Sequence, residues 1–298
     1  MDPFASFNPN PTLGALQIGV LVSAVLFGVA TMQTYIYFTR FPEDSRKMKA
    51  LTVFVWACDV AHVISFGHLL YTWTITDYGQ PERLFGVPPK SLSASTFFSG
   101  LTPACVQSFF AFRIYAFTKK AYIPSLIWFM AFLHLLGRVV LFGGTLHASS
   151  IAVSAKQWEW LITTIWCLSV VADVVITTTM VVVLRAQRSY ALRSTAAVMD
   201  KLIVWTIETG MITSASSIIV LACFVAMKGN FIWLAFHAVS MQLFSNSLLA
   251  NLNSRAALRT QNSMFLESIV SITPPYGVHV ETVRQVAYSA EPLRKTSG

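Results

Sequence analysis

Residues 13–38 read LGALQIGVLVSAVLFGVATMQTYIYF, a run that contains no charged side chain. A membrane-spanning helix needs about 20 mostly apolar residues to cross roughly 30 Å of hydrocarbon. The run therefore predicts a transmembrane helix, and positions 3–39 as a whole carry no charge. A cleaved signal peptide is disfavoured, because the run has no basic leading region and its apolar core is too long.

The same pattern, an apolar block followed by a short polar or basic break, repeats along the rest of the chain. Each block is long enough to span a bilayer with modest tilt, and none alternates as barrel strands do. The sequence predicts an all-α integral membrane bundle of seven transmembrane helices over 13–259. A short extracellular N-terminus (1–12) precedes it and a flexible cytoplasmic tail (260–298) follows. The predicted spans lie near 13–38, 50–73, 95–117, 124–146, 159–184, 202–226 and 231–251.

The composition excludes the other broad classes of protein. Of 298 residues, 55% are hydrophobic and 11% are charged, with a mean hydropathy of +0.60. Soluble domains carry roughly a quarter charged residues, so this chain could not cover a water-exposed surface. Its 22 Phe and 8 Trp also exclude disorder over most of the length. The main partner of the protein is therefore predicted to be a lipid bilayer.

The distribution of Lys and Arg predicts the orientation. Twelve of these residues flank the breaks near 39–49, 118–123, 185–201 and 255–259, and four flank the opposite ends of the spans. Cytoplasmic loops carry the excess of Lys and Arg, so the N-terminus is predicted outside and the C-terminus in the cytoplasm, with the plasma membrane as location. The net charge of +8 then follows from topology, and no nucleic-acid partner is expected.

Several ionisable side chains fall inside the predicted spans, where a charge costs about 2.5–3.5 kcal/mol on insertion scales. One hypothesis is a midplane polar pocket that binds a small-molecule ligand or an ion between the helices. The alternative is a satisfied interhelical network, in which Asp59 pairs with His62 and Asp173 with Thr177. The residues expected near the midplane are Asp59, His62, His134, Arg138, Asp173 and His237.

A second polar level is expected nearer the cytoplasm. At 1.5 Å rise per residue, Arg113 and Glu208 both lie about 10 Å inside the boundary. They are candidates for an ion pair that holds the cytoplasmic ends of two helices together. In the alternative, Arg113 extends its side chain to the headgroups. The last span also has a polar end, marked by Asn246, Asn251 and Asn253.

Sequence motifs exclude several activities. The last span has no Lys to form a retinal Schiff base, and no phosphate-binding loop or H-E-x-x-H zinc motif occurs. No enzyme activity, cofactor or bound metal is expected. An intramembrane metal hydrolase stays open as a minor alternative, because His and Asp residues are available, although no two His have the four-residue spacing of a shared metal.

Two runs carry a resemblance to a known family. Phe109–Tyr115 (FFAFRIY) closes the third span and Asn246–Arg255 (NSLLANLNSR) closes the seventh. With the acid in the second span, they resemble a large family of basidiomycete (fungal) membrane proteins that carry the domain of unknown function numbered 6534. The resemblance implies a seven-helix fungal membrane protein with a variable tail, and it implies no activity.

The layout is also similar to that of seven-helix receptors, with an Arg at the inner end of the third span. It departs from them because the second outer loop has no Cys and the seventh span has no N-P-x-x-Y. The leading hypothesis is a receptor-like or sensory protein that meets a cytoplasmic protein partner or anionic lipid through its basic loops. The alternative is a small-solute or ion-coupled transporter that uses the midplane acids.

Overall fold

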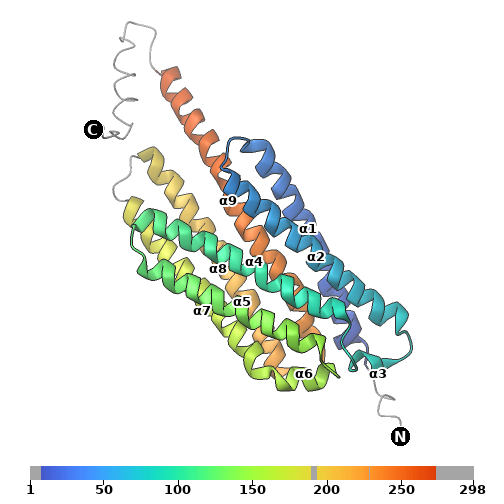
Figure 1. Cartoon of the computed structure of the whole chain (residues 1–298). Coiled ribbons are helices and arrows are strands. Elements are labelled where there is room, and N and C mark those ends of the chain that lie inside the picture. Colours follow the sequence, from blue (N-terminus) through green and yellow to red (C-terminus); the bar gives the residue numbers. More distant parts are fainter. Residues whose placement is uncertain (1–7, 189–192, 228, 273–298) are drawn as a thin grey trace. The chain divides into compact units, whose positions relative to one another are not determined.

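A computed structural model describes residues 8–188, 193–227 and 229–272 (Figure 1), with the backbone alone at 193–199 and 255–272. Every regular element within these ranges is a helix, which confirms the all-α prediction. The chain divides into two units, Met1–Ala256 and Ala257–Gly298. The helical bundle and all the sites described below belong to the first unit.

Seven helices in the described ranges are long, and most of each apolar block of the sequence lies on one of them. Four shorter elements, two of them π-helical, lie between or before the long helices: η1 (Asn10–Gly14), η2 (Thr72–Thr76), α3 (Pro81–Leu84) and α6 (Ile151–Gln157). The long helices are α1 (Ala15–Arg40), α2 (Arg46–Tyr71), α4 (Lys90–Thr118), α5 (Tyr122–Leu146), α7 (Glu159–Arg188), α8 (Arg193–Ala226) and α9 (Ile232–Ile272).

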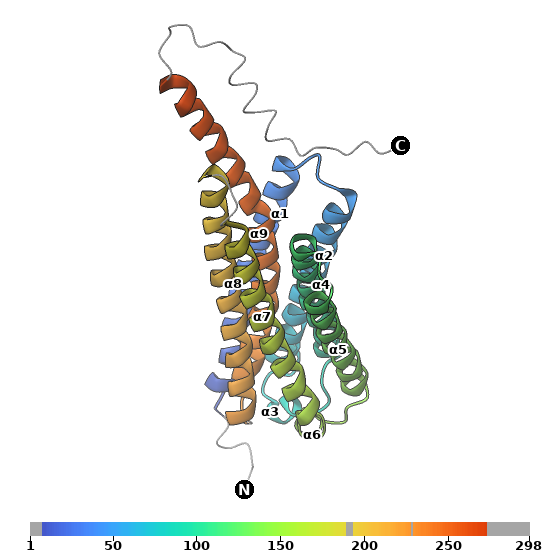
Figure 2. The ribbon, with the colours of Figure 1, turned by 90° about the vertical axis from the view of Figure 1, so that its left-hand side faces the viewer.

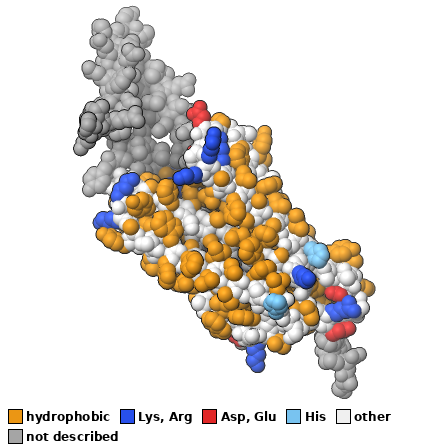
Figure 3. Space-filling model, in the orientation of Figure 1, with side chains coloured by type: hydrophobic (Ala, Val, Ile, Leu, Met, Phe, Trp, Pro, Cys, Tyr) orange, Lys and Arg blue, Asp and Glu red, His pale blue; other side chains and the backbone are white. Residues whose placement is uncertain are grey.

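Five helical stretches are long and apolar enough to cross a membrane. Many large hydrophobic side chains on them face outward, for example Ile18 and Val25 on α1 and Phe129 on α5. Figure 3 shows hydrophobic side chains over the middle of one face, with Lys and Arg toward its ends. These features indicate a multi-pass membrane protein. The stretches are Asn10–Arg40, Arg46–Thr76, Tyr122–Leu146, Glu159–Arg188 and Asp200–Ala226.

Helix α4 lies inside the bundle, where it packs against α2, α5 and α7. Further pairs form between α1 and α2, between α5 and α7, and between α7 and α8. The helices run up and down in turn, so α3, α6 and the start of α1 share one end (Figures 1 and 2). We call this end the N-terminal end. The connections from α1 to α2 and from α4 to α5 lie at the other end.

Local signals set the helix boundaries. Ser45 caps α2 by accepting a hydrogen bond from the Met48 amide at 3.4 Å, as Ser does at helix starts. Lys119 ends α4 in the left-handed conformation, with φ of 56°. The next helix begins at Tyr122, so α4 and α5 must run antiparallel because their connection is so short.

Backbone contacts tie the N-terminal end together. The Phe231 amide at the start of α9 donates to the Pro11 carbonyl at 3.1 Å, and the Ile151 amide of α6 donates to Gly86 at 2.9 Å. The Ser150 hydroxyl donates to the Phe85 carbonyl at 2.7 Å. Segments from four parts of the sequence therefore meet at this end.

Part of the predicted tail lies on a described helix. Helix α9 continues without a break to Ile272, past the predicted start of the tail at residue 260. Residues 273–298, which make up the rest of that prediction, lie outside the described part of the chain.

Candidate functional site

Arg138 of α5 and three histidines form a cluster inside the bundle. Arg138 is 5% exposed, and its guanidinium lies 4.8 Å from the centre of the Trp166 ring. His237 contacts the same ring at 5.5 Å between centroids. His62 lies 6.3 Å from His237, and Arg138 is close enough to His62, His134 and His237 to act on each electrostatically. Helices α2, α5, α7 and α9 thus converge here.

The guanidinium of Arg138 has few partners in its surroundings. It donates one hydrogen bond, from Nη1 to the Ser99 hydroxyl at 3.4 Å, and its Nε has no partner. Ser99 lies four residues before Pro103, which has no N–H, so the Ser99 carbonyl also lacks its helical bond. Since a guanidinium has five N–H donors, most of this group's hydrogen-bonding capacity is unused.

A cavity at the N-terminal end reaches down to this arginine. We call it the Arg138 cavity, and it has room of about 80 Å³ for solvent. Its described lining includes Arg138 and His237 but no Asp or Glu. Most of the remaining wall is apolar, from the loop before α4 and from α4, α5, α6, α7 and α9: Pro88, Leu92, Leu141, Ile151, Ala155, Ile162, Trp166, Trp233 and Leu234.

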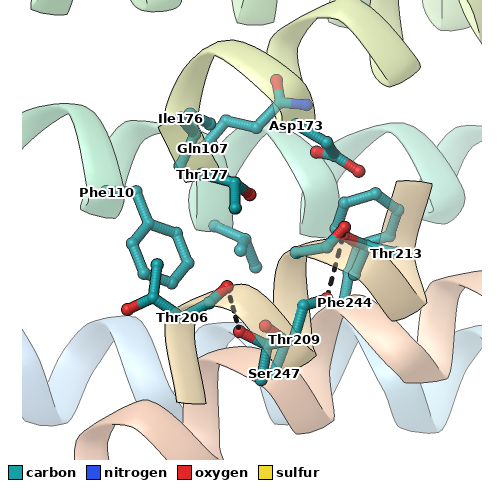
Figure 4. A pocket seen from close by; sticks show the side chains of 12 residues that line it. Gln107, Phe110, Asp173, Ile176, Thr177, Thr206, Thr209, Thr213, Phe244 and Ser247 are labelled. Atoms are coloured by element: carbon teal, nitrogen blue, oxygen red, sulfur yellow. Dashed lines mark hydrogen bonds between the residues drawn. The ribbon is translucent and has the colours of Figure 1, made fainter. Parts of the chain in front are cut away.

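Asp173 of α7 belongs to a different cavity, drawn in Figure 4, which we call the Asp173 cavity. Asp173 is 4% exposed and its Oδ2 has no hydrogen-bond partner. Gln107 and Thr213 lie beside the carboxylate, and the amide nitrogen of Gln107 is turned toward it (Figure 4). The other polar lining residues come from α7, α8 and α9: Thr177, Thr206, Thr209 and Ser247.

Asp59 of α2 lines neither of these cavities. It is fully buried, and its Oδ1 accepts a hydrogen bond from the Ser245 hydroxyl of α9 at 2.7 Å. Both ring nitrogens of His62 lack a partner, so the proposed Asp59–His62 pair is not among the described hydrogen bonds. The residues expected in one midplane pocket therefore divide into an arginine–histidine cluster, the Asp59–Ser245 contact and the Asp173 cavity.

The candidate ion pair between Arg113 and Glu208 is not one of the two described salt bridges, Arg83–Asp77 and Arg188–Asp200. Arg113 donates instead to the Asn251 side chain of α9, and Glu208 is exposed on α8. The Arg113–Asn251 hydrogen bond thus joins α4 to α9 at this level.

The polar end of the last span forms hydrogen bonds between α9 and the helices α1 and α4. Asn246 donates to the Leu26 carbonyl of α1 at 3.0 Å and accepts from Gln33 at 3.2 Å. Asn253 donates to the Gln33 carbonyl at 2.8 Å. With Asn251 bound to Arg113, these three asparagines act as interhelical contacts, which polar side chains commonly form within membranes.

Sequence reasoning missed the neutral residues of both cavities. Trp166 and Gln107 carry no charge, and nothing in their local sequence separates them from other core residues. The threonines at 206, 209 and 213 recur at helical spacing and so share one face of α8, a signal that was available. Within the described residues, no three His, Cys, Asp or Glu side chains gather where they could hold a metal ion.

The fold and its buried ionisable groups define a multi-pass α-helical membrane protein with polar cavities. Residues 169–257 match the model of a family described as a family of unknown function (DUF6534). The match runs from the middle of α7 through α8 into α9, and it contains Asp173, His237 and the polar end of α9. No curated protein matches the chain. The match supports the expected domain of unknown function, whereas the fungal origin and the likeness to receptors stay predictions.

Proposed function

We propose that this protein is a receptor-like membrane protein that binds an anionic, partly apolar ligand in the Arg138 cavity. One observation carries the proposal: a buried arginine at the floor of an apolar cavity has no acidic residue in the described lining. An unneutralised charge inside a membrane protein is costly. A carboxylate ligand would neutralise the guanidinium and accept its unused N–H groups.

The aromatic and aliphatic wall suits the rest of such a ligand. Trp166, Trp233 and Leu141 surround the space above the arginine, so an alkyl or aryl tail would bury apolar surface against them. The ligand class is therefore a small carboxylic acid with an apolar tail. No reaction is assigned to the site, and a non-enzymatic role is part of the proposal.

We further propose seven spans, with α4 and α9 in addition to the five apolar stretches. Both helices lie within the bundle, and their polar side chains, such as Ser95, Thr102, Ser245 and Asn251, are buried against other helices. These polar side chains lower the mean hydropathy of α4 and α9. Because they are buried against other helices, they are not exposed to lipid. With the basic loops in the cytoplasm, the N-terminal end and the mouth of the Arg138 cavity face outward, and the plasma membrane stays the expected location.

Glycosylation mapping tests this orientation. Glu43→Asn creates an acceptor sequence with Asp44 and Ser45, and Tyr78→Asn with Gln80→Thr creates one between η2 and α3. We expect modification of the second variant only, because only that connection is expected on the outside. Modification at position 43 would reverse the proposed topology.

Ligand binding is tested with octanoate and its methyl ester, using purified full-length protein and melting temperature as readout. The acid should stabilise the protein and the ester should not. Arg138→Gln should lose about 2–5 kcal/mol of binding free energy, since it removes one partner of a buried charge pair. Arg83→Gln, an exposed arginine at the same end, is the matched control. Equal stabilisation by acid and ester, or by neither, would contradict the proposal.

A transporter is the second candidate function. It is favoured because three cavities adjoin one another inside the bundle, as a path for a solute would require. Arg138, Trp166 and His237 also line a smaller cavity with His134, and that cavity shares Phe244 with the Asp173 cavity. Solute and proton flux into liposomes is the test, with Asp59→Asn and Asp173→Asn as variants. Flux that both variants abolish would establish transport, and absence of flux across a broad solute panel would favour the receptor.

A further inference from the structure

A further cavity adjoins the Arg138 cavity at the N-terminal end, and we call it the α6–α9 cavity. It has room of about 300 Å³ for solvent, compared with about 80 Å³ in the Arg138 cavity. The larger of the two spaces is thus the one without the buried arginine. Its described lining comes from α6, the start of α7, the end of α8 and the start of α9: Ala152, Ala155, Lys156, Glu159, Phe224 and Trp233.

Trp233 lies between the two cavities. Trp233 and Ala155 belong to the described lining of both. Trp233 precedes His237 by four residues on α9, so both side chains are on one face of that helix. At 1.5 Å rise per residue, Trp233 is about 6 Å nearer to the N-terminal end than His237. The indole therefore forms a wall above the floor of the Arg138 cavity, with the larger space behind it.

An aromatic contact supports the indole from behind. The Phe224 ring meets the Trp233 ring edge to face, with 5.4 Å between centroids and 78° between planes, a geometry that aromatic pairs favour. Phe224 is buried, and it lines the α6–α9 cavity but not the Arg138 cavity. The wall is thus held in place against a ligand tail that approaches it from the side of Arg138.

We propose that Trp233 sets the chain length of the carboxylic acids that the Arg138 cavity accepts. The carboxylate lies on Arg138, the tail follows the apolar wall as far as the indole, and a longer tail needs the space behind it. The ligands of the protein are therefore medium-chain acids, and long-chain acids are excluded. This inference rests on the proposed function, because it assigns the tail of the same ligand.

The experiment titrates purified full-length protein with hexanoate, octanoate, decanoate, dodecanoate and tetradecanoate and measures the melting temperature. The methyl ester of each acid controls for partition into detergent. Affinity should rise by about fourfold per added methylene up to a limiting chain length and then stop rising, because the tail meets the indole. Trp233→Ala should move that limit to a longer acid. It should also raise the ratio of tetradecanoate to octanoate affinity by about tenfold or more, as expected for two or more additional buried methylenes.

Two further variants make the test independent of how well Trp233→Ala folds. Ala155→Leu adds bulk to the other residue shared by the two cavities, so it should move the limit to a shorter acid. Trp160→Ala is the matched control, because this tryptophan is 66% exposed and is absent from the described lining of both cavities. It should leave the chain-length profile unchanged.

Arg138→Gln distinguishes failure of this inference from failure of the proposed function. If no acid stabilises the protein more than its ester does, or if Arg138→Gln leaves binding intact, both are wrong. If binding depends on Arg138 but Trp233→Ala and Ala155→Leu keep the wild-type profile, only the role of Trp233 is wrong. Wild-type affinity that keeps rising through tetradecanoate would overturn that role as well.

Discussion

The Arg138 cavity and the Asp173 cavity lie in the same bundle but have opposite chemistry. The first contains a buried cation and no acid in its described lining, and the second contains a buried acid and no base. The first is wide and mostly apolar, and the second is narrow and lined with hydroxyl groups. The bundle thus keeps a buried arginine and a buried aspartic acid in separate cavities.

Asp59 is a third buried ionisable residue, and it lies outside both cavities. Its carboxylate is also buried, but it accepts a hydrogen bond from Ser245 on another helix. Asp59 thus links α2 to α9 through its Oδ1. Its Oδ2 lacks a partner, as does that of Asp173, but Asp59 lines neither of the two cavities. The predictions below use this distinction.

Phe244→Ala should have the largest effect. The Phe244 side chain is 3% exposed and lines the Asp173 cavity and the small cavity below Arg138, so its removal joins the two. We expect a loss of about 3–5 kcal/mol in the free energy of unfolding, measured by SDS titration in mixed micelles. Phe236→Ala, on the same helix but 39% exposed, should cost clearly less. Equal losses would mean that Phe244 does not separate the cavities.

Ser245→Ala should turn Asp59 into an unpartnered acid. The hydrogen bond to a charged group is lost while the shape barely changes, so we expect a loss of about 1.5–3 kcal/mol in the free energy of unfolding. Ser240→Ala is the control, since its hydroxyl bonds only to the His237 carbonyl one turn before it. If both variants behave alike, Asp59 does not depend on Ser245.

Two glycines allow each cavity to be disturbed separately. A Cβ at Gly100 would lie 2.6 Å from the Arg138 Cβ, and one at Gly210 would lie 2.0 Å from the Thr177 Oγ1. Each change to Ala should cost about 1–3 kcal/mol of stability through overpacking. Gly100→Ala should weaken octanoate binding, whereas Gly210→Ala, which disturbs the other cavity, should leave octanoate binding unchanged.

Gly28→Ala is the control for both glycine variants, because no atom lies within 4 Å of its added Cβ. It should raise stability slightly, by up to about 1 kcal/mol, through helix propensity. Loss of octanoate binding in Gly210→Ala as well would show that the two cavities are not independent.

The smallest expected effect is the coupling between the two charges. Arg138 and Asp173 do not share a cavity lining, so their effects on stability should add. The double variant Arg138→Gln with Asp173→Asn should match the sum of the single variants within about 0.5 kcal/mol. A larger coupling energy would mean that the two charges compensate each other across the bundle.

Apolar length was enough to place the helices. The run at 13–38 lies on η1 and α1, and the block at 124–146 lies on α5, because a hydrocarbon layer requires long apolar stretches that satisfy their own backbone hydrogen bonds. Helix α9 was harder to delimit. Its polar residues beyond 251 resemble a tail, yet the helix runs on to Ile272.

The burial of the six midplane residues followed from their depth along each helix, but their grouping did not. Arg138 and His237 came together with Trp166, whereas Asp173 faces α8 and Gln107 (Figure 4). Arg113 donates to Asn251 of α9, a partner that its depth along α4 did not predict. Position along a helix gives depth through the rise per residue, but it does not say which helix lies opposite.

The sequence by itself therefore determined the helical class, the apolar stretches and the presence of costly ionisable groups inside them. These properties depend on composition and on distances along one chain segment. Only the tertiary structure decided that the buried arginine and the buried aspartate occupy separate cavities. That separation depends on which helix faces pack together, and packing is set by side-chain contacts between segments far apart in the sequence.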